Sequence, residues 1–203
     1  MKKYLGACKK GAEMVKQLKR IVISCLILWV ALGTLPGCEQ NDGDEKTPVS
    51  TNVIAELYFI NGEYARTGDE ALDHYLTEDR ELQIPEGENA WIMILDALKT
   101  VDPAFGETAV SEDALFRNVY VSNEDDTLMI VDLESIGPGG GSMQEGFFIG
   151  QIVETILNNC DLFWDSRNAE KVLFLLKGES VDSLMGHFDA GEPFDRYYQN
   201  SGG

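Results

Sequence analysis

The chain has little cysteine and no apolar run long enough to span a membrane. Its four cysteines are Cys8, Cys25, Cys38 and Cys160, so a domain that begins after Cys38 holds one thiol and cannot form an internal disulfide. The longest apolar run, residues 21–32, has twelve residues, whereas a helix that crosses a hydrocarbon core of roughly 30 Å needs about 20. The run is typical of the hydrophobic region of a secretory signal.

The first 37 residues differ in charge from the rest. They hold seven Lys/Arg and one acid, Glu13, and they end in Leu-Pro-Gly immediately before Cys38. This pattern resembles the signal and lipobox of bacterial lipoproteins, in which the cysteine receives a diacylglycerol and becomes the new N-terminus. We therefore predict a lipoprotein signal peptide over residues 1–37 and lipidation of Cys38. Met14 is an alternative start, and a retained N-terminal anchor helix is the alternative to cleavage.

Positive charge is scarce beyond this leader. The formal net charge of the whole chain is −19, and removal of residues 1–37 makes it more negative by six. Such a surface repels phosphate backbones and anionic headgroups, so we expect no nucleic-acid binding and no electrostatic adhesion to membranes. Two acyl chains, at roughly 0.8 kcal/mol per buried methylene, would anchor the protein at the outer face of the cytoplasmic membrane in spite of this charge.

Histidine is also scarce, and motifs for catalysis are missing from the sequence. His74 and His187 are the only two histidines, and there is no HExxH and no Gly-x-Ser-x-Gly motif. We predict no catalytic residue, no metal ligand and no cofactor. His187 and Asp189 form a candidate functional turn, for which the simpler interpretation is a histidine bonded to Asp189 or to the backbone. The acidic residues 123–126 lack the spacing of a calcium-binding EF-hand.

The remaining residues are predicted to form one domain with flexible ends. Low hydrophobicity, charge and a proline predict a disordered tether over residues 38–52, and residues 197–203 are predicted to be a flexible tail. The domain is expected to span residues 53–196. Residues 53–60 have strand character, and the Asn-Gly pair that follows predicts a type I′ hairpin turn into residues 63–66.

Further strands are predicted in the middle and at the end of this domain. Residues 81–85 alternate with period two and end at a proline, which predicts a short strand. Residues 116–122 and 127–133 are predicted to form a hairpin. Residues 172–176 are continuously apolar, which is typical of a strand buried on both faces, and we place this strand centrally.

Two helices are predicted as well. Apolar residues recur at helical spacing from Trp91 to Leu98, with Asn89 as the N-cap. Ser142 and Glu145 have the spacing of a capping box, which predicts a second helix that stops in a left-handed conformation after residue 158. Helices, hairpins and a central strand together predict an α+β fold, a two-layer sandwich of a mixed β-sheet with two helices packed on one face.

The order of these segments resembles that of GerMN domains, a sporulation and spore-germination family. The resemblance extends over about residues 53–196 and depends on segments 57–59, 80–82, 131–135, 152–156, 172–178, 186–189 and 193–194. It implies a scaffold or interaction module from a Gram-positive, endospore-forming bacterium, related in architecture to the ring-building domains of sporulation channels and without catalytic residues.

We therefore expect a lipid-anchored, non-catalytic module of sporulation, germination or envelope assembly. Its partner would be another cell-envelope protein or a second copy of the chain. A hydrolase of cell-wall polysaccharide is an alternative, and it predicts a cleft with two carboxylates and a raised pKa on one of them. A solute- or cation-binding lipoprotein is the other alternative, and it predicts a concave pocket with convergent polar groups.

Overall fold

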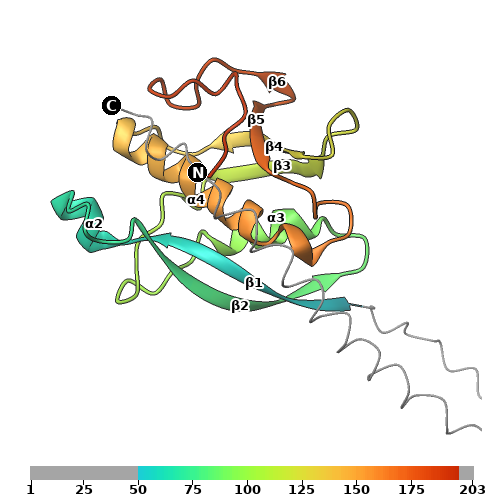
Figure 1. Cartoon of the computed structure of the whole chain (residues 1–203), viewed down its shortest axis with the longest axis horizontal. Coiled ribbons are helices and arrows are strands. Elements are labelled where there is room, and N and C mark those ends of the chain that lie inside the picture. The colour runs from blue at the N-terminus through green and yellow to red at the C-terminus, as the bar shows by residue number, and fades with distance from the viewer. Residues whose placement is uncertain (1–49, 197–203) are drawn as a thin grey trace, which may run out of the picture. The chain divides into compact units, whose positions relative to one another are not determined.

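The computed structural model describes residues 50–196, which begin with a long two-stranded sheet (Figure 1). β1 (Ser50–Ile60) pairs antiparallel with β2 (Tyr75–Pro85) along their full lengths. β1 starts three residues before the expected start of the domain, so residues 50–52 of the predicted tether belong to a strand. The predicted signal peptide, Cys38 and the C-terminal tail lie outside the described residues.

The hairpin turn predicted at Asn61-Gly62 is wrong. The Asn61 side chain accepts hydrogen bonds from the backbone N–H groups of Glu63 and Tyr64, and it thereby caps α2 (Gly62–Thr67). Asn61 has a φ of −71°, whereas a type I′ turn needs positive φ at both central residues. Residues 63–66, predicted as a strand, are therefore helical, and β1 pairs with a strand that starts only at residue 75.

A second, mixed sheet has the strand order β3-β4-β5-β6. β3 (Ala114–Val121) and β4 (Leu128–Ile136) form the predicted hairpin. β4 pairs in parallel with β5 (Lys171–Leu176), which pairs antiparallel with the short β6 (Glu179–Ser180). β5 thus has a neighbour on each side, which confirms its predicted central position.

Both predicted helices are present, although two of their predicted ends are wrong. α3 (Ala90–Ala97) is capped by the Asn89 side chain, as expected. α4 (Ser142–Asn158) begins at the predicted residue, but Gly141 is its N-cap and no side chain caps the backbone there. At its other end Asn159 has a φ of −104°, which is not left-handed. The side chains of Glu145 and Asn159 are instead bonded to distant parts of the fold.

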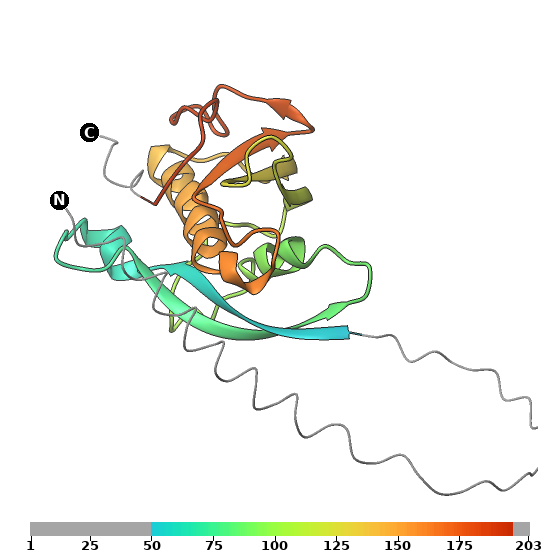
Figure 2. The ribbon, with the colours of Figure 1, turned by 45° about the vertical axis from the view of Figure 1, so that its right-hand side comes forward.

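α4 lies between the two sheets (Figure 2). Beyond its first turn the helix is buried on several sides, and Phe148, Ile152 and Ile156 are fully enclosed. The expected α+β class is confirmed, with a mixed four-stranded sheet, a two-stranded sheet and helices packed against them. Within residues 50–196 we find no helix with the length and apolar character needed to cross a membrane.

Candidate functional site

A groove of about 340 Å³ lies between α2 and α4. We call it the α2–α4 groove. One wall is formed by α2 and the start of β2, the other by the exposed side of α4, and residues from the end of the described chain close it. A shallower hollow of about 650 Å³ shares three of its lining residues, His74, Tyr75 and Glu154.

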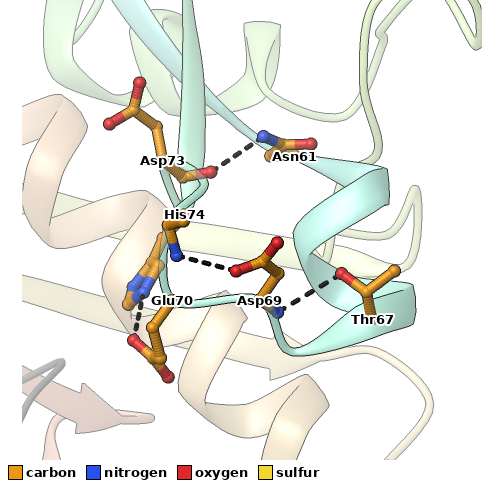
Figure 3. Close-up of polar contacts among 7 residues, drawn as sticks. Asn61, Thr67, Asp69, Glu70, Asp73 and His74 are labelled. Atoms are coloured by element: carbon orange, nitrogen blue, oxygen red, sulfur yellow. Dashed lines mark hydrogen bonds and ion pairs between the residues drawn. The ribbon is translucent and has the colours of Figure 1, made fainter.

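Local hydrogen bonds fix the loop between α2 and β2, which forms the first wall (Figure 3). α2 ends at Gly68, whose φ of 65° is a left-handed conformation that glycine adopts without strain. The Asn61 side chain, besides capping α2, donates a 2.9 Å hydrogen bond to the carbonyl of Asp73. Asp69 accepts a bond from the backbone N–H of Ala71. These bonds hold the loop in the conformation that places His74 at the groove.

Aromatic rings from three elements meet in the groove. The ring of Tyr64 stacks on that of His74, with centroids 3.9 Å apart and planes inclined by 21°. Phe147 of α4 lies 6.2 Å from both Tyr64 and Tyr75, at interplanar angles of 81° and 85°. Tyr75 in turn lies edge-on to Tyr58, with centroids 6.5 Å apart. The groove therefore has rings in several orientations as its walls.

Glu154 lies on the same side of α4 as Phe147, and it is half-buried. Burial raises the pKa of its carboxyl group above the usual value, and the nearby Arg196 and a hydrogen bond from Asn158 offset only part of this effect. Burial, followed by the charges of Glu56 and Glu154, raises the pKa of Tyr58 to about 12.

The tyrosines near Glu154 keep their protons over the physiological pH range. Burial, with the charge of Glu154 next in importance, raises the pKa of Tyr75 far above its usual value. The site thus combines two carboxyl groups, those of Glu154 and Asp195, with phenol hydroxyls and aromatic rings. This set of groups suits a cationic or hydrogen-bonding ligand. Within residues 50–196 no group of three or more His, Cys, Asp or Glu side chains is placed to hold a metal ion.

Glu145 fixes the segment that closes the groove. Its side chain is fully buried in the first turn of α4. Oε1 accepts hydrogen bonds from the Ser183 hydroxyl and from the backbone N–H groups of Leu184 and Met185, and Oε2 accepts one from the N–H of His187, at 2.8–3.1 Å. The residue after His187 is Phe188, which lines the groove.

The predicted functional turn is exposed and its two residues are not bonded to each other. His187 is held through its backbone N–H by Glu145, and Asp189 accepts a hydrogen bond from the N–H of Gly191. Among the described residues His187 and Asp189 share no hydrogen bond. In the acidic β3–β4 turn, Asp125 accepts bonds from the N–H and the hydroxyl of Thr127, as expected for side chains that bond their own turn.

Sequence patterns did not identify the groove residues, because they come from distant parts of the chain. One signal was available. Phe147 is apolar, but it lies beside Gly146 and outside the apolar side expected for the helix. A large ring at that position indicates contact with a part of the fold other than the core. Gly146 allows the ring of Phe188 to approach, since a Cβ at this position would lie 3.2 Å from it.

The described residues thus form an α+β domain with an aromatic groove beside its longest helix. No family model matches the chain, and no curated protein matches it. The fold is similar to the tandem GerMN domains of the sporulation protein GerM from Bacillus subtilis, with a TM-score of 0.50 and 16% sequence identity over 72% of this chain. The expected resemblance to GerMN domains is confirmed at the level of the fold.

The chain spans about half of that tandem protein, 47% of its length. The first GerMN domain of GerM alone gives a TM-score of 0.47 at 17% identity, over 71% of this chain and 95% of that one. A candidate lipoprotein from Clostridium perfringens gives 0.44 at 17% identity, over 72% and 88%. These structural matches identify no catalytic family.

Proposed function

We propose that the chain is a lipid-anchored, extracytoplasmic protein whose GerMN-like domain binds a segment of another cell-envelope protein in the α2–α4 groove. The observation that supports this proposal most directly is the cluster of aromatic rings that lines a concave surface. Aromatic side chains that line a pocket are the usual anchors of protein interfaces. The sporulation role of GerM makes sporulation, germination or envelope assembly the process in which we place this protein.

The rim of the groove also suits a polypeptide partner. Met143 lies at the start of α4 with 63% of its surface exposed, beside the half-buried Phe147. Methionine is flexible and polarizable, and it is common on surfaces that accept peptide segments. An exposed methionine next to a ring cluster gives an apolar surface that a partner would cover with a gain of about 25 cal/mol per Å² of apolar area.

Membrane attachment through Cys38 is the first test. Cys38→Ser should move the protein from the membrane fraction to the soluble extracytoplasmic fraction, because the lipid supplies the anchor. Fractionation of the producing cells, with mass spectrometry of the N-terminal peptide, would measure this. Cys160→Ser is the matched control and should stay in the membrane fraction. An unmodified, full-length wild-type chain in the cytosol would contradict the proposed location.

A photo-crosslinking residue at Met143 in the full chain should capture a specific envelope protein in intact cells. The same residue at Glu124, in the exposed β3–β4 turn, is the control position. The captured protein is then purified and its affinity measured directly. We expect Phe147→Ala and Met143→Glu each to weaken binding at least tenfold, because both remove groove contacts.

The outcome depends on folding as well as on binding. Met143 is largely exposed, so Met143→Glu should leave the melting temperature unchanged even where Phe147→Ala lowers it. Trp164→Ala removes an aromatic ring that is 79% exposed and lies outside the groove, and it should leave the affinity unchanged. Equal affinity of wild type and both groove variants for the captured protein would exclude the groove as the binding site.

A solute-binding lipoprotein is the second candidate function. The observation in its favour is that a carboxyl group and tyrosines converge on one concave pocket, as that alternative predicts. It differs from the first in one measurable respect. A solute-binding protein retains a small molecule when it is purified under native conditions, and the groove variants would lose that molecule without affecting any protein complex.

A further inference from the structure

We propose that the segment bound in the α2–α4 groove inserts a protonated primary amine, the side chain of a lysine, where Tyr75 and Glu154 line both the groove and the adjoining hollow. This inference depends on the proposed function and names the chemistry of the bound segment. It rests on the arrangement of three rings, on the charges around the groove and on the space along α4.

All three rings line the groove, and His74 covers one face of Tyr64 by stacking on it. Phe147 stands nearly perpendicular to both Tyr64 and Tyr75, and the centroid of its ring lies 6.2 Å from the centroid of each tyrosine ring. An aromatic face carries negative charge density, and an ammonium group within about 6 Å of a ring centroid is attracted to it. An ammonium group in the groove would therefore lie beside rings that meet each other edge to face.

The charged groups around the site are mainly acidic. Glu154 lines both hollows, Asp195 lines the groove and Asp73 lines the adjoining hollow. Arg196 donates hydrogen bonds to Asn158 and to the carbonyl of Leu157, and its charge also acts on Glu154, so it offsets part of the negative charge here. A carboxylate or phosphate ligand would be repelled by this surface, whereas a basic one is attracted.

The histidine at the groove, His74, does not reverse the excess of negative charge. His74 stacks on Tyr64, and its Nε2 lies 3.4 Å from the carboxylate of Glu70, so this histidine also has an acidic neighbour. The formal charge of the whole chain is −19. A lysine-bearing segment of a partner would therefore be attracted at long range as well as at the site.

The wall that α4 contributes to the groove offers apolar surface to the stem of a lysine. At about 1.5 Å per residue, Glu154 lies about 10 Å along the helix from Phe147. Gly150 lies between them in the groove wall and is itself buried. A stem of four methylenes is shorter than this stretch, so an ammonium group at the Glu154 carboxylate places the stem against the Glu154 end of the wall.

The test uses Nα-acetyl-lysine methylamide as a probe of the purified, isotope-labelled protein followed by NMR. We expect shift changes at Tyr64, Phe147 and Glu154. The norleucine analogue, which has no amine, and the Nε-acetylated analogue should each bind at least tenfold more weakly. Glu154→Gln should weaken binding of the lysine probe at least fivefold, whereas Glu112→Gln, an exposed residue outside both hollows, should leave it unchanged.

Failure of this inference is distinguishable from failure of the proposed function. Equal binding of the lysine and norleucine probes, or shift changes outside the groove, would overturn the amine inference. Phe147→Ala and Met143→Glu could still abolish binding of the captured partner, in which case the groove remains a protein site of other chemistry. Replacement of the lysines in the bound segment of that partner by glutamine should reduce affinity at least tenfold, and unchanged affinity would also overturn the inference.

Discussion

Glu145→Ala is expected to lower the free energy of unfolding by about 3–5 kcal/mol, because it removes a buried, charged acceptor from several donors at once. The Glu145 carboxylate is fully buried and accepts hydrogen bonds from the Ser183 hydroxyl and from three backbone N–H groups. Alanine would leave these N–H groups without their partner in the interior. Urea unfolding of the purified domain would measure the loss.

Two controls separate this effect from a general loss of negative charge. Glu112→Ala removes an exposed carboxylate and should change stability by less than about 0.5 kcal/mol. Glu145→Gln keeps one acceptor oxygen, so it should cost less than Glu145→Ala. A loss below about 1 kcal/mol for Glu145→Ala would mean that the loop over residues 183–187 finds other acceptors, and it would contradict the assigned role.

The contribution of Glu145 should also depend on pH. Burial acts to raise the pKa of this carboxyl group, but the bonds from Met185, Ser183 and His187 outweigh burial and hold the pKa below its usual value of 4.5. A carboxyl group with a lowered folded-state pKa stabilises the fold above its unfolded-state pKa, and this stability is lost as the pH falls through the folded-state pKa. The difference between wild type and Glu145→Ala should therefore shrink in acid below about pH 4.5.

Glu145 also shows where a sequence pattern is ambiguous. Its spacing from Ser142 is that of a capping box, which is a purely local motif. The pattern correctly predicted that a helix begins at Ser142. It could not show that the carboxylate turns away from the helix end, because its donors lie about 40 residues further along the chain. A local motif predicts the backbone well, but the tertiary structure determines where its side chain is bonded.

The prediction of a hairpin turn at Asn61-Gly62 is wrong for a related reason. Both residues favour the positive φ of a hairpin, but β1 finds a partner of equal length in β2, with a register from Ser50↔Pro85 to Ile60↔Tyr75. Asparagine is equally suited to cap a helix, and the chain uses it for α2. By contrast, the strand at Val172–Leu176 was predicted correctly, because five consecutive apolar residues fit a strand inside a sheet. The predicted burial on both faces is wrong, since Leu173 and Leu175 are only half-buried.

The groove is the part that the sequence could not predict. Its rings come from α2, from the start of β2 and from α4. In the sequence, each of these aromatic residues looks like an ordinary residue of the hydrophobic core. Only the fold places Tyr64 and Phe147 with centroids 6.2 Å apart. No spacing along the chain indicates that Tyr64, His74 and Phe147 meet. They do so because β1 pairs with β2, which positions the loop that carries His74.

Asn159→Leu is the second substitution with a large expected effect, a loss of about 2–4 kcal/mol in unfolding free energy. The side chain is 5% exposed and forms hydrogen bonds with the backbone of β1 at the edge that does not pair with β2. Its Oδ1 accepts the N–H of Glu56 at 2.9 Å, and its Nδ2 donates to the carbonyls of Glu56 and Thr155 at 2.8 and 2.7 Å. Leucine has the same number of side-chain heavy atoms but is larger, and it satisfies none of these groups, each of which costs about 1–3 kcal/mol when buried without a partner.

Hydrogen exchange can distinguish the loss of the Asn159 hydrogen bonds to β1 from a general loss of packing. Amide hydrogen exchange at Glu56 should accelerate more in Asn159→Leu than exchange at Phe59, because only the first N–H is bonded to the replaced side chain. Asn123→Leu, at an exposed turn, is the matched control and should be neutral. Asn159→Asp keeps an acceptor for the Glu56 N–H but loses both donated bonds, so it should also be destabilising. If Asn159→Asp were as stable as wild type, the two donated bonds would contribute nothing, and packing alone would hold α4 against the edge of β1.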